Sequence, residues 1–203
     1  MMLSKREKTI LAIQQAAKQA FYEKSYSETN VDEIATLAQC SKGTVYNYFG
    51  GKEQLFLTVL ETLFQEMCEK ARLPRFDSSL SPKELLEQAI MHGQRFFLEG
   101  SPSKLFRLLL IDGQCVPRTR RERFLRDWLC FQSELLALFD KLEREKGYAI
   151  SNKEKAAEHL HNLCQGDFFL KQTISIPFLL SEKQLEQMRD ESLALFLAAY
   201  GPV

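Results

Sequence analysis

Apolar residues recur every three or four positions along almost the whole chain, which is the spacing of amphipathic helices. In the first such segment Ile10, Ala17 and Phe21 share one face. Ser4 can cap this helix, and Glu7, three residues later, completes a capping box. The one short stretch with strand character, TISIPFLL, is interrupted by a proline. The pattern therefore predicts an all-α fold.

Two short helices and a turn follow the first segment. Asn30 is a good N-cap for the first of the two. The turn covers residues 39–41, Ser41 can cap the next helix, and Gly50 ends it. A long helix with an apolar face then begins at Lys52. This is the layout of a helix-turn-helix, a motif whose second helix enters the major groove of DNA.

The clearest break in composition runs from Arg72 to Pro82, which holds two prolines and three serines. We place a domain boundary there. Ser81-Pro82 and Ser101-Pro102 are signals for helix starts. The periodicity downstream predicts five more helices, at roughly 82–99, 103–114, 117–146, 152–175 and 182–200. The chain is expected to contain about nine helices.

Charge and cysteine content limit where on the protein DNA can bind and in which compartment the protein works. Lys plus Arg and Asp plus Glu number 27 each, so any contact with DNA must be local. Residues 1–52 carry seven basic and five acidic side chains, a small local excess. The five cysteines are scattered and form no CxxC motif, which indicates free thiols in a reducing cytosol. We see neither a signal peptide nor a membrane-spanning run, and expect a cytoplasmic protein without a membrane partner.

The second helix of the pair, SKGTVYNY, is too polar for a core helix. Val45 and Phe49, four apart, can anchor it, which leaves its polar residues facing outward or sideways. Lys and hydroxyl groups suit phosphate oxygens, and Asn47 can bond adenine through two atoms. Gly43 would let the backbone approach DNA closely, and Lys52 lies at a helix N-terminus that attracts phosphate. The alternative is a surface helix of an ordinary bundle.

The segment from about Lys8 to Leu60 resembles the N-terminal domain of TetR-family transcriptional repressors. The residues that carry the resemblance are IL…AA…F…SYSETNVDEIATLAQCSKGTVYNYFGGKEQLF. It implies that Thr29 contacts a phosphate before the second helix, and that Lys52 binds one at the fourth. With the helix cap Ser41 and the base reader Asn47 included, the expected DNA-binding residues are Thr29, Ser41, Lys42, Gly43, Thr44, Tyr46, Asn47, Tyr48 and Lys52.

Three positions depart from the family pattern. Ser25 stands where the family usually has a glycine in a left-handed turn, and a little backbone strain is expected there. Gln39 and Cys40 replace the usual Gly-Val of the turn. Cys40 is interpreted as a small buried residue in place of valine, in preference to a redox switch.

The resemblance also implies the domain organisation. Residues 1–52 would bind DNA, a helix at about 52–71 would connect, and residues 75–203 would bind a ligand and dimerise. The stretch FRLLLIDGQCVPRTRRERF is similar to AcrR-like and AefR-like members. The family pairs the last two helices into a four-helix bundle about a two-fold axis, so the resemblance implies a homodimer through the last two helices.

The second domain is rich in aromatic residues, most of which should be plain core. The candidate walls of a ligand pocket are Phe97, Trp128, Phe131 and Phe168. Pockets between bundle helices are mainly apolar, so we expect a small apolar or amphipathic effector. A metal site is not expected, because His159 and His161 lie on different sides of a helix, and His161 with Cys164 supplies too few ligands. No cofactor is expected.

The basic run from Arg118 to Arg126 is interpreted as a solvated face or a helix near the DNA-binding domain. The sequence contains no enzyme motif, neither a glycine-rich phosphate loop nor GxSxG nor HExxH. We therefore expect a DNA-binding transcriptional regulator, a repressor that acts as a homodimer on a palindromic operator and is released by ligand. An activator, a protein-interaction module and, more remotely, a helical enzyme are the alternatives.

Overall fold

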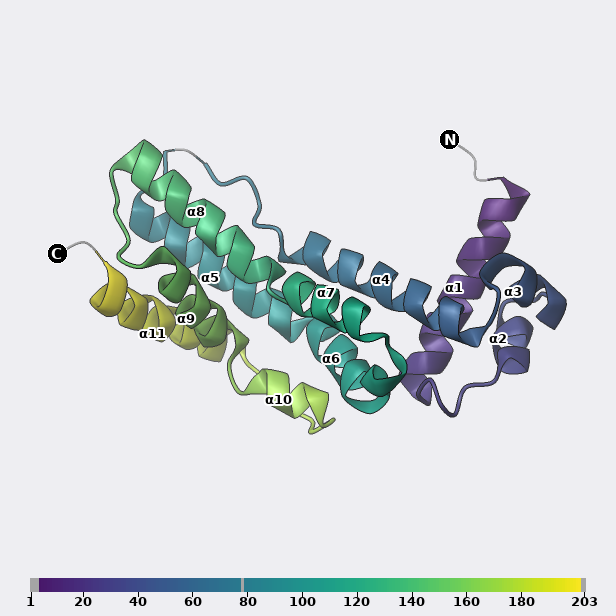
Figure 1. Cartoon of the computed structure of the whole chain (residues 1–203). Coiled ribbons are helices and arrows are strands. Elements are labelled where there is room, and N and C mark those ends of the chain that lie inside the picture. Colours follow the sequence, from purple (N-terminus) through teal and green to yellow (C-terminus); the bar gives the residue numbers. More distant parts are fainter. Residues whose placement is uncertain (1–3, 78, 202–203) are drawn as a thin grey trace. The chain divides into compact units, whose positions relative to one another are not determined.

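A computed structural model describes residues 4–77 and 79–201, which fold into helices joined by short loops (Figure 1). Within these residues there is no strand, which confirms the all-α prediction. The described part of the chain contains eleven α-helices and one 3-10 turn: α1 (Lys5–Glu23), α2 (Val31–Leu37), α3 (Lys42–Phe49), α4 (Lys52–Ala71), α5 (Pro82–Leu98), α6 (Ser101–Asp112), η1 (Gly113–Cys115), α7 (Arg118–Trp128), α8 (Cys130–Lys146), α9 (Lys153–Gln165), α10 (Phe168–Thr173) and α11 (Glu182–Tyr200).

The chain divides into two compact units. The first comprises the residues up to Glu66 together with Lys104–Phe124, and the second comprises Met67–Ser103 and the residues from Leu125 onward. The first unit is larger than the domain 1–52 expected from the sequence. The difference arises because most of α4 and a later segment, which includes most of α6, pack with α1 to α3.

Reciprocal serine caps begin three of the helices in the described part of the chain. Ser4, Ser81 and Ser181 each accept a hydrogen bond from the backbone three residues ahead, whose side chain bonds back to the serine N–H. Such reciprocal caps satisfy backbone donors that a helix start otherwise leaves unpaired. The predicted starts at Ser4 and at Ser81-Pro82 are confirmed.

The core of the first unit lies where α1, α2 and α3 meet α4. Phe21 of α1 and Phe56 of α4 are buried and meet edge to face, with ring centroids 5.0 Å apart. Val45 is fully buried and Phe49 is 9% exposed, which confirms both as the anchors of α3. Burying side chains of this size stabilises the fold by roughly 1.5–3 kcal/mol each.

The second unit is a bundle in which α5, α8, α9 and α11 lie against one another (Figure 1). Its core residues come from one face of each helix. Phe139 of α8 and Phe196 of α11 are both buried, with centroids 5.5 Å apart. Gly93 of α5 allows the close approach of α8, because a Cβ atom there would lie 2.4 Å from the ring of Phe131.

Two predicted helices are each divided in the structure, so the bounds 117–146 and 152–175 were wrong. The first breaks at Leu129, between α7 and α8, where neither glycine nor proline marks the turn. The second breaks at Gly166, whose φ of 56° and ψ of −174° end α9. Gly166 was a visible signal, since this conformation is open mainly to glycine.

The turn between α2 and α3 closes in a regular way despite its unusual sequence. The N–H of Cys40 donates to the Ala35 carbonyl at 3.0 Å, and the N–H of Gln39 donates to the Thr36 carbonyl at 3.1 Å. This pair of bonds is a Schellman motif, which requires a left-handed residue after the helix end. Gln39 fills that position with a φ of 53°. The departure from glycine therefore leaves the turn geometry intact.

Replacing Gln39 by glycine should stabilise the protein, because a side chain in the left-handed region costs about 1 kcal/mol. We expect Gln39→Gly to raise the free energy of unfolding by about 0.5–1 kcal/mol in urea titrations. Gln39→Ala is the matched control and should bring no gain, since alanine keeps the Cβ atom. Equal stability of the two variants would contradict the assignment of strain to this residue.

Candidate nucleic-acid interface

Helix α3 presents a polar face to solvent. Lys42, Gly43, Tyr46 and Asn47 are exposed, while the anchors described above hold the opposite face in the core. Ser41 caps the helix by accepting a hydrogen bond from the Thr44 N–H at 3.0 Å. A short, capped helix with exposed donors and acceptors has the chemistry needed to contact phosphates and base edges.

Gly43 is not required by the fold. A Cβ atom at this position would meet only the Ser41 hydroxyl, at an ordinary contact distance of 3.6 Å. Glycine inside a helix also costs about 0.5–1 kcal/mol relative to alanine. The flat patch that Gly43 leaves on the exposed face of α3 therefore brings no gain in stability.

Lys42 forms an ion pair with Asp32 of α2, with 2.9 Å between Nζ and the carboxylate. Asp32 raises the pKa of Lys42, so the ammonium is charged at neutral pH. Both side chains are half exposed, and such pairs contribute little to stability. The lysine can exchange this partner for a phosphate at small cost.

Thr29 is buried, with 3% of its surface exposed. Its hydroxyl donates to the Ser25 carbonyl at 2.6 Å, with the Ala20 carbonyl 3.3 Å away, and its N–H donates to Ser25 at 3.2 Å. The resemblance implied that Thr29 contacts a phosphate. In this geometry its hydroxyl is occupied within the protein and does not face solvent. Thr29 instead holds the loop before α2 against the end of α1.

Lys52 also bonds within the protein. Its ammonium donates to the carbonyls of Tyr26 at 2.8 Å and Thr29 at 3.0 Å, and lies 4.4 Å from the centre of the Tyr26 ring. An ammonium has three N–H donors, so one is left for a further acceptor. Lys52 thus joins the start of α4 to the loop between α1 and α2.

Asp112, at the end of α6, completes this arrangement. The residue is 2% exposed, and its carboxylate accepts a hydrogen bond from the N–H of Tyr26 at 2.8 Å. Sequence reasoning missed it, because the two residues are 86 positions apart and no local pattern marks the acid.

Ser25 adopts a φ of 139° in the same loop. The position therefore has the positive φ that the resemblance implied for a glycine. Its hydroxyl accepts a hydrogen bond from the Glu28 N–H at 3.3 Å, which gives the serine a local partner.

Arg6 was also missed by sequence reasoning. Its guanidinium lies 5.9 Å from the ring centre of Tyr48, so a cation on α1 adjoins the polar face of α3.

The second unit brings several of the predicted pocket residues together. Phe97 and Phe131 are buried with centroids 6.1 Å apart, and Trp128 and Phe97 each contact Phe169. Phe168 is buried as well, and stacks against Phe178 at 6.3 Å. These rings fill space between α5, α8, α9 and α10.

His161 lies inside this aromatic cluster, with its ring 5.1 Å from Phe97 and 6.0 Å from Phe131. It is 6% exposed, and among the described residues its Nδ1 atom has no hydrogen-bond partner. Burial lowers the pKa of His161 to about 4, so the ring is neutral at neutral pH. An unpaired buried nitrogen costs about 1–3 kcal/mol, which a ligand with a suitable group would recover.

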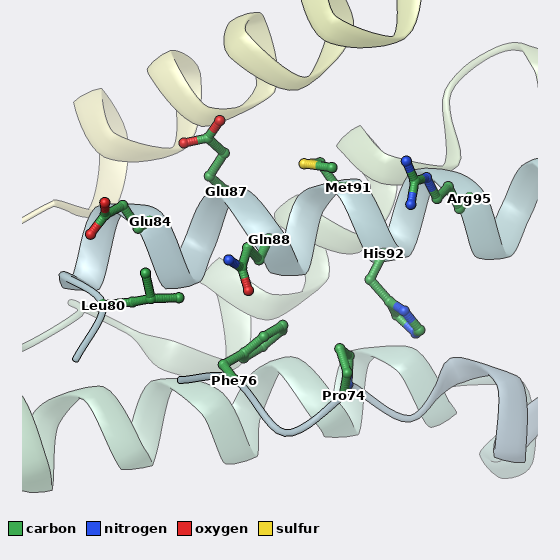
Figure 2. A pocket seen from close by; sticks show the side chains of 9 residues that line it. All are labelled: Pro74, Phe76, Leu80, Glu84, Glu87, Gln88, Met91, His92 and Arg95. Carbon is green, nitrogen blue, oxygen red and sulfur yellow. The ribbon is translucent and has the colours of Figure 1, made fainter. Parts of the chain in front are cut away.

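A hollow of about 440 Å³ lies between α5 and the linker that precedes it. Figure 2 shows Gln88 and His92 of α5 pointing toward Phe76 and Pro74 of the linker. None of the four predicted pocket residues lines it. Glu87, on its edge, pairs with Arg189 of α11 at 3.2 Å.

The described residues contain no group of three or more side chains placed to hold a metal. His159 bonds the Tyr200 hydroxyl at 2.6 Å, and His161 lies in the aromatic cluster. No helix within the described ranges is long and apolar enough to cross a membrane.

Comparison with known families matches both parts of the chain. Residues 13–59 match the family described as bacterial regulatory proteins, tetR family. Residues 84–202 match the C-terminal domain of AefR-like transcriptional repressors. Both families consist of regulators, not enzymes.

Individual relatives agree. The transcriptional regulator YhgD of Bacillus subtilis is 42% identical over 66 residues, which cover 32% of this chain and 33% of YhgD. The repressor Rv3405c of Mycobacterium tuberculosis is 34% identical over 101 residues, 48% of this chain and 50% of the repressor. TtgR of Pseudomonas putida is 24% identical over 74% of each chain. The match thus spans between a third and half of the length of the first curated relatives.

Solved structures extend the likeness to nearly the whole chain. A TetR-family transcriptional regulator from Mesorhizobium loti is 25% identical with a TM-score of 0.75, covering 98% of this chain and all of the other. The flavonoid-responsive regulator FrrA is 23% identical with a TM-score of 0.72, covering 96% and 97% of the two chains. The likeness to FrrA shows a shared fold.

The buried neutral histidine should make stability depend on pH. Unfolded His161 takes up a proton below about pH 6.5, whereas the folded protein resists protonation down to about 4. The stability that the neutral His161 ring contributes is therefore fully present above about pH 6.5. The free energy of unfolding then falls by up to about 1.4 kcal/mol per pH unit as the pH decreases toward 4.

We expect His161→Phe to flatten the plot of unfolding free energy against pH between about 6.5 and 4. His159→Phe, on the exposed side of the same helix, should keep the wild-type slope. Equal slopes for wild type and His161→Phe would contradict a buried neutral ring.

Proposed function

We propose that this chain, which belongs to the TetR family of bacterial regulatory proteins and has an AefR-like C-terminal domain, is a homodimeric repressor that a small molecule releases from DNA. That it is a DNA-binding transcriptional regulator follows from the family. The dimer, the operator contacts, the effector and a cytoplasmic location belong to the proposal.

The exposed polar face of α3 carries the DNA-binding part of the proposal. In a symmetric dimer, two such helices would occupy successive major grooves about 34–36 Å apart. Asn47, exposed near the end of α3, would read a base edge. Phosphate contacts would come from Ser41, Lys42, Thr44, Tyr46 and Tyr48.

Two residues of the expected interface take a different role in this proposal. Thr29 positions the loop before α2 through its buried hydroxyl. Lys52 positions the same loop with two of its N–H groups and would offer the third to a phosphate.

Gly43 would let the DNA backbone approach α3, since only open surface lies beyond it.

Exposed apolar side chains near the chain's end support the dimer. Leu195 of α11 is 60% exposed, and Leu170 of α10 is 61% exposed. A helix of a monomer needs only one apolar stripe to pack against its own core. A second apolar stripe, exposed to solvent, would be covered in a dimer and would stabilise it. The proposed interface pairs the segment of α9 and α10, together with α11, with their two-fold copies.

The aromatic cluster around His161 supports the choice of effector. Phe97, Trp128, Phe131 and Phe168 would pack against an apolar body, while the unpaired Nδ1 atom of His161 would bond one polar group. Because the ring is neutral, it would favour an uncharged hydrogen-bonding group over an anion. This describes a small apolar or amphipathic molecule with a single polar function.

Release from DNA would follow from a change in the distance between the two α3 helices of the dimer. An effector that binds better to a state with the wrong spacing lowers DNA affinity by the coupling free energy. Helix α4 would transmit the change, because it runs from Lys52 into the second unit. Effector-bound dimers that hold the operator as tightly as the free protein would rule this mechanism out.

A gel shift with the DNA upstream of the protein's own gene tests the proposed function, since such regulators often control neighbouring genes. Loss of the shifted band on adding effector separates a repressor of this type from an activator. No shift with any DNA would favour the protein-interaction module.

Substituting Gly43 should move stability and DNA affinity in opposite directions. Gly43→Ala should raise the unfolding free energy by about 0.5–1 kcal/mol, because alanine favours a helix and has room there. The same methyl group should weaken operator binding by about tenfold or more, as measured by fluorescence anisotropy.

Gly113→Ala is the matched control, because a Cβ atom there also meets open space. It should leave DNA affinity unchanged. Full affinity in Gly43→Ala would remove this face of α3 from the interface.

A charge on the proposed dimer surface should separate the protomers. We expect Leu195→Glu to shift the protein from dimer to monomer at micromolar concentration in sedimentation velocity, because a carboxylate would be buried without a partner. Leu125→Glu, at a similarly exposed leucine of α7, is the control and should remain dimeric. A dimeric Leu195→Glu with an unchanged helix signal would overturn this interface.

A further inference from the structure

Two of the five cysteines meet inside the second unit. Cys68 on the last turn of α4 and Cys130 at the start of α8 are hydrogen bonded to each other through their side chains. The Cys68 thiol also lies 3.4 Å from the carbonyl oxygen of Asp127, one turn before Cys130. The two sulfur atoms therefore face each other across the junction of α4 with α8.

We propose that Cys68 and Cys130 are a dithiol that a hydroperoxide oxidises to a reversible disulfide joining α4 to α8. A disulfide needs the two Cβ atoms about 3.5–4.5 Å apart, and thiols in hydrogen-bond contact already bring the two side chains together. The pair went unnoticed in the sequence, because 61 residues separate the two cysteines and no CxxC motif marks them.

Cys68 is the thiol that reacts first. The hydrogen bond donated by Cys130 lowers the pKa of Cys68, and the guanidinium of Arg72 acts in the same direction. Cys68 is also partly exposed, so a small oxidant can reach it. Cys130 is the resolving thiol, since the same hydrogen bond and burial raise its pKa.

The reaction balances with one peroxide. With hydrogen peroxide, the Cys68 thiolate attacks one oxygen, an S–O bond forms as the O–O bond breaks, and hydroxide leaves and is protonated to water; an organic hydroperoxide would release its alcohol instead. The Cys130 sulfur then attacks the sulfenic sulfur, an S–S bond forms, and the S–O bond breaks with loss of a second water. The two thiols give up two electrons and two protons, and a dithiol reductant restores them by exchange.

The remaining cysteines have other surroundings. Cys164 is buried, and its thiol lies 3.8 Å from the Ile90 carbonyl. Burial raises the pKa of the Cys40 thiol, which disfavours its oxidation. Cys115 is exposed in η1 and can react with other molecules, so it has to be removed in any test.

The test treats the full-length Cys115→Ser protein with hydrogen peroxide, then blocks free thiols and maps the peptides by mass spectrometry. We expect one intramolecular Cys68–Cys130 peptide, lighter by two hydrogens than its parts, which dithiothreitol reverses. Trp128, the single tryptophan, lies two residues before Cys130 and should lose fluorescence as the disulfide forms. The melting temperature should rise in the oxidised protein, because the bond closes a long loop.

Cys68→Ser and Cys130→Ser should each abolish the cross-linked peptide and the peroxide-dependent change in fluorescence, while Cys40→Ser should keep both. In Cys130→Ser, the Cys68 sulfenic acid should persist and be trapped by dimedone. Two outcomes would overturn the proposal: alkylation of both thiols after peroxide treatment of the wild-type pair, or oxidation of Cys68 to the sulfonic acid while Cys130 stays free.

Discussion

The loop between α1 and α2 is held by polar groups that reach it from three different helices. The Asp112 carboxylate accepts the N–H of Tyr26, and the Lys52 ammonium donates to the carbonyls of Tyr26 and Thr29. The Thr29 hydroxyl returns to the end of α1. Buried backbone groups must find partners, so these contacts fix the path of the loop and with it the positions of α2 and α3.

This arrangement explains why so polar a helix as α3 is well placed. Only Val45 and Phe49 are buried from its eight residues, which is a small apolar contact for a helix. Its orientation depends equally on the capped turn before it and on the loop held by Lys52 and Asp112. A protein with zero net charge can bind DNA in this way, since Lys42 is paired with a single half-exposed acid that a phosphate can replace.

Local patterns predicted the parts of the fold that depend on neighbouring residues. Helix caps at Ser4 and Ser81, the anchors of α3, and the helical nature of the second unit all follow from spacings of three or four. The break at Leu129 did not, because packing and not a breaker residue sets it.

Contacts between distant residues could not be predicted in this way. No pattern in the sequence links Asp112 to Tyr26, or Cys68 to Cys130. Thr29 shows the converse limit, since its position in the family pattern implied a phosphate contact, whereas the structure buries its side chain. The exposed polar face of α3 was predictable because Val45 and Phe49, four residues apart, fix which side is buried, whereas the aromatic cluster around His161 required the fold.

The second unit contains two kinds of chemically distinct site, and one of them includes the last turn of α4. The cluster of aromatic rings and neutral His161 suits a small molecule, and the thiol pair at the end of α4 suits an oxidant. Both adjoin α8, whose first turn carries Cys130 and Phe131. A ligand and an oxidant would therefore act on the same junction through different bonds.

Hydroxyl-radical footprinting of the wild-type protein, on genomic fragments selected by binding, tests the central claim most directly. A dimer that reads DNA through α3 should protect two inverted half-sites whose centres lie about 34–36 Å apart, one helical turn along the duplex. Selection of no sequence above random DNA, or protection of a single unrepeated site, would contradict the account.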